Sequence, residues 1–312
     1  MKPTIAVVIP CLNEASTIGK VVDDFRRVLP EARIYVFDNM STDGSAEVAA
    51  AHGAEVRRVK LRGKGQVVAR MMETVAADIH IMVDGDDTYP AEAAVQLIQP
   101  ILEDRADMVV GTRLGSHDRA AFRPLHVLGN RLVRGLINLI FRCRLSDIMS
   151  GYRAYTAELA RFVPVTAVGF EVETELTLQS LYHGFVIAEV PVPYRPRPAG
   201  SESKLRTFRD GARVLWTIFN VARSVKPLTF FGLVALLLLA LGVLCGLPAV
   251  VQYFTLPGHQ VKSFPLLFVG VGLVILAFLS LGVGVLLHAI NVRLKEIISL
   301  MRKAAGPGQG RG

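Results

Sequence analysis

The chain has 312 residues, which is enough for one large domain and a smaller second part. Hydrophobic residues make up 51% of it, and its mean hydropathy of +0.40 is high for a purely soluble protein. The net charge of +8 is compatible with nucleic-acid binding, but the lysines and arginines cluster beside the apolar C-terminal runs, so we expect anionic lipid headgroups and no nucleic acid as the partner.

Short apolar runs alternate with helical segments along the first part of the chain. Strands are expected at residues 4–9, 34–37, 55–59, 79–83 and 108–110. Helices are expected at residues 15–28, after 41–45, at 66–75 and at 91–102. Strands that alternate with helices predict an α/β fold with a mostly parallel, doubly wound sheet and flanking helices.

The pattern is less regular further along. Residues 128–141 and 170–182 are expected to be helical, and residues 185–190 to form a strand before a proline-rich segment at 191–198. Residues 205–225 carry basic, Phe and Trp side chains at helical spacing, which predicts an amphipathic helix at the membrane interface. The alternative is a soluble amphipathic helix that packs on the sheet.

Two long apolar runs follow. Residues 228–254 contain no charged side chain, and residues 264–290 contain none apart from the titratable His288. Each run exceeds the roughly 20 residues that cross a bilayer core, so the sequence predicts two transmembrane helices; two buried helices of a soluble core are the alternative. The link between the runs has Lys262 as its one basic residue, so the positive-inside rule places both termini in the cytoplasm.

These features predict an integral protein of the cytoplasmic membrane in four parts. The parts are a cytosolic α/β domain at 1–203, juxtamembrane amphipathic helices at 204–226, a transmembrane hairpin at 227–292 and a basic cytosolic tail at 293–312. The N-terminal apolar run is too short for a signal peptide, and three widely spaced cysteines indicate reduced thiols rather than a disulfide framework. Paired spans and an amphipathic belt also allow a homo-oligomer.

The strand at residues 79–83 ends in three carboxylates, those of Asp84, Asp86 and Asp87. Carboxylates this close repel one another unless a cation or hydrogen-bond donors meet them. A turn at the glycine between them would let Asp84 and Asp86 reach one hard divalent cation, such as Mg²⁺, which keeps places for water and substrate phosphates. The alternative is a solvated acidic turn that caps the helix beginning near Pro90.

Other polar residues are expected at the same edge of the sheet. Glu14 and Asp38 can accept hydrogen bonds from ribose hydroxyls or a base N–H. Lys64, in a Gly-Lys-Gly turn, can donate to a phosphate, although it equally fits a flexible surface turn. The chain contains no G-x-x-x-x-G-K-[ST], and no G-x-G-x-x-G follows the first strand. A nucleotide site other than a P-loop or a Rossmann dinucleotide site is therefore expected.

Seven short motifs occur in order along the chain. They are V-V-I-P-C-L-N-E, F-D-N-M-S-T-D-G-S, G-K-G, V-D-G-D-D, M-S-G-Y-R, G-F-E-V-E-T-E and S-K-L. The first four resemble those of family 2 glycosyltransferases with the GT-A fold, and the last three, with the two spans, resemble polyprenyl-phosphate glycosyltransferases of the dolichol-phosphate mannose or glucose synthase type. This resemblance implies inverting, metal-dependent transfer from a nucleotide-sugar, of the UDP-glucose or GDP-mannose type, to a polyprenyl phosphate. The acceptor would be undecaprenyl or dolichyl phosphate, and the product a lipid-linked sugar for cell-envelope glycans.

The resemblance also implies roles on the donor side. The residues that it implies for nucleoside binding are Pro10, Asn13, Glu14 and Asp38. It implies that Asp84 and Asp86 hold Mg²⁺ or Mn²⁺ against the diphosphate, to which Lys64 can donate. Some relatives carry Gln two places after the second aspartate as a further metal ligand; Thr88 stands there in this chain, which leaves the third protein ligand open.

The candidates for binding the acceptor phosphate, by the same resemblance, are Arg113, Ser150, Arg153 and Arg144. Relatives often carry an arginine where this chain has Ser146, so which arginine acts stays open. Lys204, in S-K-L, is expected to reach a phosphate as the site closes. Asp147 is expected to orient an arginine or help the acceptor, or else to cap a helix or turn.

A phosphate monoester has a second pKa of about 6 and is already an anionic nucleophile at neutral pH, so no general base is required. Two other functions stay as alternatives. A processive polysaccharide synthase usually carries Q-x-x-R-W and more spans, whereas the one tryptophan here, Trp216, lies in no such segment. A non-catalytic nucleotide-binding membrane scaffold would not need an intact acidic centre.

Overall fold

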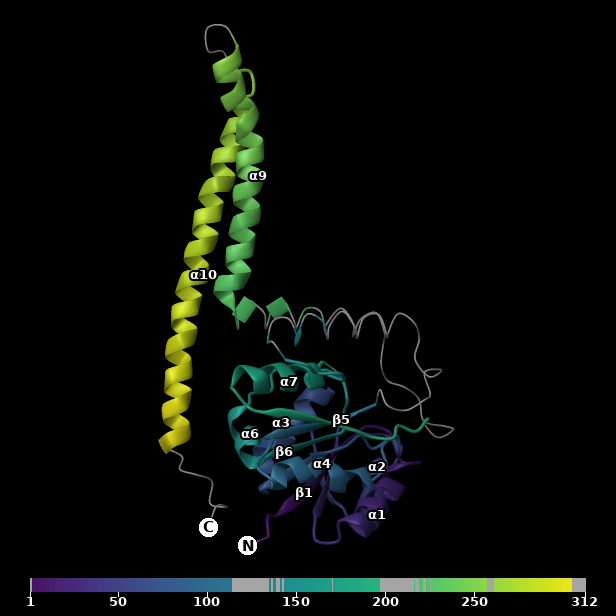
Figure 1. Cartoon of the computed structure of the whole chain (residues 1–312). Helices are drawn as coiled ribbons and strands as arrows, with labels where there is room; N and C mark the ends of the chain where they lie inside the picture. The colour runs from purple at the N-terminus through teal and green to yellow at the C-terminus, as the bar shows by residue number, and fades with distance from the viewer. Residues whose placement is uncertain are drawn as a thin grey trace. The chain divides into compact units, whose positions relative to one another are not determined.

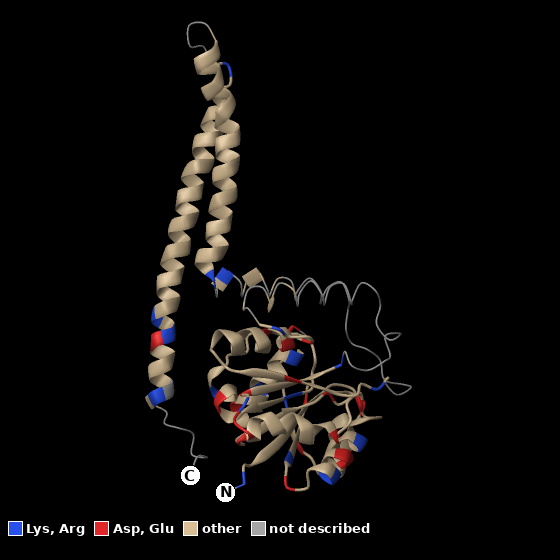
Figure 2. Ribbon diagram, in the orientation of Figure 1, with Lys and Arg blue, Asp and Glu red and all other residues tan. Residues whose placement is uncertain are grey.

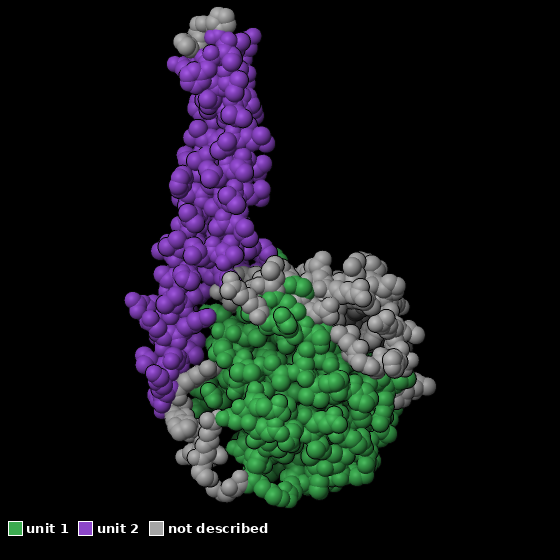
Figure 3. Space-filling model, viewed as in Figure 1, with its two compact units in different colours: residues 1–218, 307–312 green, residues 219–306 purple. Residues whose placement is uncertain are grey.

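The computed structural model describes residues 2–113, 143–169, 171–196, 226–256 and 261–304, with a few positions between 135 and 141 and between 216 and 224. The chain divides into two compact units, Met1–Ile218 with Pro307–Gly312 and Phe219–Gly306 (Figure 3). The first unit holds a β-sheet with flanking helices, and the second holds two long apolar helices (Figure 1).

The first unit is built on a seven-stranded sheet with the order β3-β2-β1-β4-β6-β5-β7. The strands are β1 (Ile5–Cys11), β2 (Arg33–Asp38), β3 (Glu55–Arg58), β4 (Ile79–Met82), β5 (Met108–Thr112), β6 (Arg153–Thr156) and β7 (Ile187–Pro191). All neighbouring pairs are parallel except those of β6, which runs antiparallel to both β4 and β5. The mostly parallel α/β sheet expected from the sequence is confirmed.

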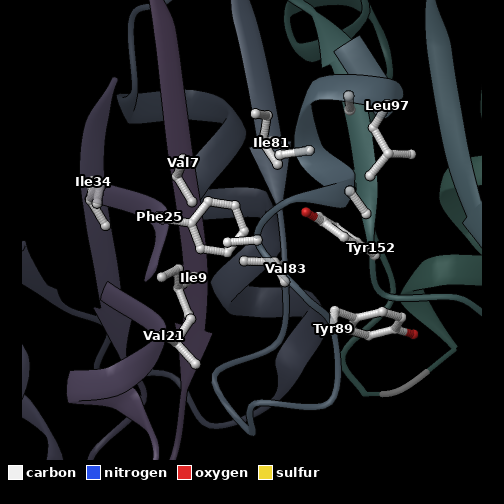
Figure 4. Close-up of a cluster of buried hydrophobic side chains, with 14 of the residues drawn as sticks. Val7, Ile9, Val21, Phe25, Ile34, Ile81, Val83, Tyr89, Leu97 and Tyr152 are labelled. Carbon is white, nitrogen blue, oxygen red and sulfur yellow. The ribbon is translucent and has the colours of Figure 1, made fainter. Parts of the chain in front are cut away.

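Helices cover both faces of the sheet. They are α1 (Ile18–Val28), α2 (Ser45–Ala51), α3 (Lys64–Thr74), α4 (Ala93–Leu102), α6 (Ala157–Phe162) and α7 (Val172–Tyr182). On one face, Val7 and Ile81 pack with Phe25 of α1 and Leu97 of α4 (Figure 4). The residues that form the cluster on the other face include Ala6, Val8, Met71 and Leu176. Because alternate side chains of β1 enter opposite clusters, its sequence is apolar throughout rather than alternating.

Two elements were not expected from the sequence. Residues 153–156 form β6, and α6 follows it directly. The strand is only four residues long and begins with an arginine, so no apolar run marks it. The expected helices at 128–141 and 205–225 lie mostly outside the described residues.

The second unit is a helical hairpin of α9 (Pro227–Thr255) and α10 (Phe264–Ala304). Both helices are long and apolar enough to cross a membrane, and only 6% and 11% of their most apolar windows are buried inside the protein. Charged side chains are absent from most of their length (Figure 2). Helices of a soluble core would be mostly buried, so the exposed apolar surface favours the transmembrane interpretation of the hairpin.

The two helices approach closely at glycines. A Cβ at Gly270 would lie 2.7 Å from the carbonyl oxygen of Gly242 and 3.0 Å from the amide nitrogen of Gly246. Further along, the Ser280 hydroxyl donates a 3.1 Å hydrogen bond to the carbonyl of Phe231. Small residues at a helix contact and a hydroxyl bonded across it are typical of packing inside a bilayer.

Candidate functional site

The carboxyl ends of β1 and β2 lie side by side and are joined by their loops. Cys11 pairs with Asp38, which is buried, and the Asn39 amide donates to the carbonyl of Cys11 at 2.8 Å. The loop after β1 then docks on the loop after β2, where Asn13 Oδ1 accepts from the amide of Thr42 at 2.8 Å. The sequence-predicted nucleoside residues Pro10, Asn13, Glu14 and Asp38 therefore belong to one rim.

Asn39 connects this rim to the Gly-Lys-Gly turn. Its side-chain amide donates to the carbonyls of Val59 and Leu61, and its Oδ1 accepts from the amide of Gly63 at 2.8 Å. Gly63 has a φ of +129°, and a Cβ there would run into the carbonyl oxygen of Val168. Gly65 lies just as tightly against the carbonyl oxygen of Ala167. The turn is thus locked under another backbone segment and is not a flexible surface turn.

Lys64 points from this turn into an acidic pair. Its Nζ lies 2.5 Å from Asp84 Oδ1, at the end of β4, and 2.6 Å from Glu173 Oε1 of α7. Only 12% of the Lys64 side chain and 5% of the Glu173 side chain are exposed. Burial works to lower the pKa of Lys64, but attraction to Asp84 and Glu173 outweighs it and raises that pKa above its ordinary value. Lys64 is therefore a buried cation held between two carboxylates.

Three glutamates in Gly169–Glu175 have different roles. Glu171 accepts from the amides of Val168 and Gly169, at 3.3 and 3.0 Å. Glu175 accepts from the amide of Ala167 at 2.7 Å, so both carboxylates hold the segment that covers the Gly-Lys-Gly turn. Glu173, two residues from each, faces Lys64 instead.

The acidic turn after β4 is shaped by its neighbours. Asp86 is 2% exposed, and its Oδ1 accepts from the amide and hydroxyl of Thr88, at 3.2 and 2.6 Å. The Asp84 carboxylate lies against Gly151, where a Cβ would collide with it. Asp87 adopts a φ of +57°, and its Oδ1 lies 2.8 Å from Nζ of Lys20.

The donor set fits a divalent cation shared with a ligand. Among the residues that the structure describes, no three His, Cys, Asp or Glu side chains form a ready metal site. Mg²⁺ is commonly held by one or two carboxylates plus substrate phosphates, so Asp84 and Asp86 suit it without a third protein ligand. In this structure Asp84 Oδ1 already meets a cation, the ammonium of Lys64.

Arg113, just after β5, is held by the carboxylate of Asp147. Its Nε and Nη2 donate to Asp147 Oδ2 and Oδ1 at 2.8 and 3.0 Å, and its own amide donates to Oδ2 at 3.1 Å. Asp147 is 1% exposed; burial works to raise its pKa, but Arg113 and nearby amides outweigh this and lower the pKa below its ordinary value. Glu189 of β7 in turn accepts from the amides of Ser146 and Asp147, which fixes the loop.

Tyr89 links the acidic turn to Arg113. Its hydroxyl lies 3.3 Å from Ser150 Oγ. Burial raises the pKa of Tyr89 above its ordinary value, and Asp84 adds to the rise while Arg113 opposes it. Tyr194 packs against the Tyr89 ring, with centroids 5.2 Å apart, and the Arg113 guanidinium lies 5.7 Å from the Tyr194 centroid. Asp84, which lies against Gly151 next to Ser150, and Arg113, which lies near Tyr194, are therefore both in the surroundings of Tyr89.

The sequence of this chain matches that of a known protein family. The model of Glycosyl transferase family 2 matches residues 6–162, about half of the chain. The chain belongs to glycosyl transferase family 2. It is a glycosyltransferase, and the resemblance drawn from the seven motifs is confirmed at the level of this family and of its polyprenyl-phosphate members.

Two relatives and one solved structure illustrate the similarity of this family 2 enzyme to others. Glycosyltransferase AglJ of Haloferax volcanii is 35% identical over 80% of this chain and 81% of its own. A dolichyl-phosphate hexose transferase of the same organism is 30% identical over 70% of this chain and 93% of its own. The glucosyl-3-phosphoglycerate synthase of Mycobacterium tuberculosis, solved with Mn²⁺, UDP-glucose and phosphoglyceric acid, has a TM-score of 0.58 at 25% identity, over 71% of this chain and 80% of its own.

The remaining acceptor-side candidates of the glycosyltransferase lie in different surroundings. Arg144 is exposed, and Lys204 lies outside the described residues. Arg153 is fully buried in β6, where its guanidinium donates to the carbonyls of Ser150 and Ile148 and to the Thr177 hydroxyl. Burial lowers its pKa to about 10. This placement makes Arg153 a structural support for the Ser150 loop and does not present it to a ligand.

Two residues that line or support the site of the glycosyltransferase were not singled out from the sequence. Tyr89 and Glu189 stand alone in their segments, so no pattern marks them. Glu173 belongs to the G-F-E-V-E-T-E motif, but its pairing with Lys64 depends on the packing of α7 near α3.

Proposed function

We propose that this glycosyltransferase moves a glycosyl group from a nucleotide-sugar to the phosphate of a polyprenyl phosphate, with inversion at the sugar carbon. The observation that carries the proposal is that a carboxylate and a guanidinium both lie near Tyr89. Asp84 lies against Gly151, next to the Ser150 that contacts the Tyr89 hydroxyl, and Arg113 lies near the Tyr194 ring that packs on Tyr89. A transfer between a diphosphate donor and a phosphate acceptor needs both a cation-binding and an anion-binding half. The similarity to a dolichyl-phosphate hexose transferase supports this choice of acceptor.

The donor half is assigned to the rim formed by β1, β2 and β4. We assign nucleoside contacts to Pro10, Asn13, Glu14 and Asp38. Asp84 and Asp86 would hold Mg²⁺ or Mn²⁺, which when bound supplies Lewis-acid stabilisation of the departing diphosphate. The structural neighbour solved with Mn²⁺ and UDP-glucose supports a divalent cation and a nucleotide-sugar.

The acceptor half is assigned to Arg113, with Ser150, whose hydroxyl contacts that of Tyr89, as a further candidate. The Arg113–Asp147 pair is preformed, so the guanidinium loses little freedom when it meets a phosphate. Arg144 and Lys204 stay as further candidates for phosphate contact, and Arg153 is assigned a positioning role only.

For this reaction the protein has to position the two substrates and to stabilise their negative charges. A phosphate oxygen of the acceptor attacks the anomeric carbon, the bond from that carbon to the donor diphosphate breaks, and the diphosphate leaves with the electron pair. Because the acceptor is already an anion near neutral pH, no side chain has to remove a proton. The cationic side chains offset the repulsion between two anionic reactants.

The apolar hairpin fits a lipid acceptor. We propose that α9 and α10 span the cytoplasmic membrane with both termini in the cytoplasm, since Lys262 is the only basic residue between the two runs. A polyprenyl phosphate would then present its headgroup at the cytosolic surface. A small water-soluble phosphate acceptor would not require a membrane anchor, so the hairpin favours a lipid acceptor.

The test is a donor and acceptor panel with the full-length protein. Labelled UDP-glucose and GDP-mannose are each incubated with undecaprenyl phosphate or with 3-phosphoglycerate, and the product is partitioned between solvent and water. We expect label in the lipid fraction with one donor and undecaprenyl phosphate. Label found only in a water-soluble product would contradict the proposed acceptor.

A further inference from the structure

Lys64 presents a cation to one of the carboxylates proposed as metal ligands. Its ammonium lies 2.5 Å from Asp84 Oδ1, and a metal ion on that oxygen would have to take its place. Two positive charges cannot share one carboxylate oxygen without strong repulsion in a site where Lys64 is only 12% exposed. The paired state seen here and a metal-bound Asp84 Oδ1 are therefore alternatives.

The backbone of Lys64 is fixed, so any exchange has to come from its side chain. Gly63 and Gly65 lie in contact with the carbonyl oxygens of Val168 and Ala167, and the amide of Gly65 donates to the Val168 carbonyl at 3.1 Å. The four-carbon stem of a lysine can nevertheless rotate about several bonds. Glu173, 2.6 Å away on the other side, can keep the ammonium partly neutralised while it moves.

We infer that Lys64 competes with the divalent cation for Asp84 and is released by the diphosphate of the donor. A diphosphate oxygen can accept a hydrogen bond from the Lys64 ammonium in place of Asp84 Oδ1. Asp84 can then bind the metal while Lys64 still has two anionic partners, the diphosphate and Glu173. Metal alone then binds weakly, and metal together with a nucleoside diphosphate binds tightly. The two ligands are coupled, and by linkage each raises the affinity of the other by the same factor. The inference rests on the metal role of Asp84 proposed above.

Binding of Mn²⁺ alone tests the competition. Free Mn²⁺ is titrated against the full-length protein without nucleotide and followed by its electron paramagnetic resonance signal. Lys64→Met should bind Mn²⁺ at least about tenfold more tightly than the wild type, since a charge-assisted hydrogen bond no longer opposes it. Lys64→Gln should show the same gain in Mn²⁺ affinity, and it replaces Lys64→Met in the experiment if that variant does not fold. Lys64→Arg keeps the cation and should keep the weak affinity.

Lys20 supplies the matched control. Its ammonium lies 2.8 Å from Asp87 Oδ1 of the same acidic turn, but its side chain is 53% exposed. Lys20→Met removes an equal charge from the neighbourhood, and screening by solvent should limit the gain in Mn²⁺ affinity to less than about twofold. Equal gains in Lys64→Met and Lys20→Met would mean a general charge effect and would overturn the inference.

The coupling is measured by equilibrium dialysis of labelled UDP and GDP with and without Mn²⁺. In the wild type, Mn²⁺ should strengthen binding of one of the two nucleotides, and this factor should fall at least about threefold in Lys64→Met. An unchanged factor would overturn the inference. If Asp84→Asn leaves the affinity for Mn²⁺ unchanged, the proposed metal role of Asp84 is wrong as well. If Asp84→Asn abolishes Mn²⁺ binding while Lys64→Met and Lys20→Met gain equally in Mn²⁺ affinity, only the inferred competition by Lys64 is wrong.

Discussion

The guanidinium of Arg113 meets the carboxylate of Asp147 through two parallel hydrogen bonds, from Nε at 2.8 Å and from Nη2 at 3.0 Å. Such two-point pairing fixes the plane of the guanidinium as well as its position. The pair is almost entirely buried on the aspartate side and lies beside Tyr89 and Tyr194. Arg113 is thus a preset cation at the carboxyl end of β5.

Replacing Arg113 with alanine should separate the two substrates. The variant loses the cation assigned to the acceptor, so we expect the KM for polyprenyl phosphate to rise about 10- to 100-fold, in line with a lost charged hydrogen bond of about 1.5–3 kcal/mol. Nucleotide affinity should stay within about twofold, because the nucleoside rim lies on β1 and β2. Steady-state kinetics and nucleotide dialysis measure both; an equal loss on both would place Arg113 on the donor side.

Asp86→Asn tests the acidic turn without disturbing its shape. The amide oxygen of the substituted side chain can still accept the two Thr88 hydrogen bonds, so the melting temperature should change little. We expect transfer to fall at least about 100-fold, because the side chain no longer offers an anionic ligand. Asp87→Asn is the control: its partner is the exposed Lys20, and activity should stay within about twofold. Similar losses in both variants would argue against a specific role for Asp86.

Glu189→Gln should act on Arg113 from a distance. Glu189 accepts hydrogen bonds on both oxygens from Ser146 and Asp147, and a glutamine has one acceptor oxygen in place of two. We expect a loss of about 1–3 kcal/mol of stability and a raised KM for the lipid, with nucleotide affinity unchanged. Glu31→Gln, at an exposed site, should change neither. A variant with reduced stability but an unaltered lipid KM would limit Glu189 to folding.

Gly270→Ala tests the contact between α9 and α10. The added Cβ would lie 2.7 Å from the Gly242 carbonyl, so the helices must separate. Gly272→Ala, two residues on, meets nothing within 4 Å and serves as the control. We expect Gly270→Ala, but not Gly272→Ala, to lower the free energy of unfolding in detergent by about 1–3 kcal/mol, measured by thermal denaturation. Equal stability of the two would contradict close packing of this hairpin.

The sequence was sufficient for the architecture wherever apolar runs were long or regular. β1, β2, β4, α1, α4 and both apolar helices of the hairpin occur within a few residues of the expected bounds, apart from a longer C-terminal end of α10. β6 could not be found in this way, because its four residues include an arginine that pairs with loop carbonyls only in the folded chain. The antiparallel direction of β6 also depends on its tertiary neighbours β4 and β5.

The sequence predicted which residues lie at the strand ends of the site, but not which side chains they pair with. Parallel strands bring Asp38 and Asp84 to one edge, which the order of elements already implies. That Lys64 lies between Asp84 and Glu173 required knowing that α7 packs near α3, which lies far from it in the sequence. The resemblance made Arg153 a candidate for binding the acceptor phosphate, and only the fold reveals the internal acceptors to which its guanidinium donates.

The most direct test of the central claim is the rate of sugar transfer to undecaprenyl phosphate by the full-length enzyme, with Mg²⁺ or Mn²⁺ and then with excess EDTA. In the wild type, we expect a lipid-phosphate-linked sugar to form with the divalent cation, its formation to stop with EDTA, and its formation to resume when the cation is restored; in Asp86→Asn we expect no such transfer. Transfer at the same rate in EDTA, or an Asp86→Asn enzyme as fast as the wild type, would contradict this claim.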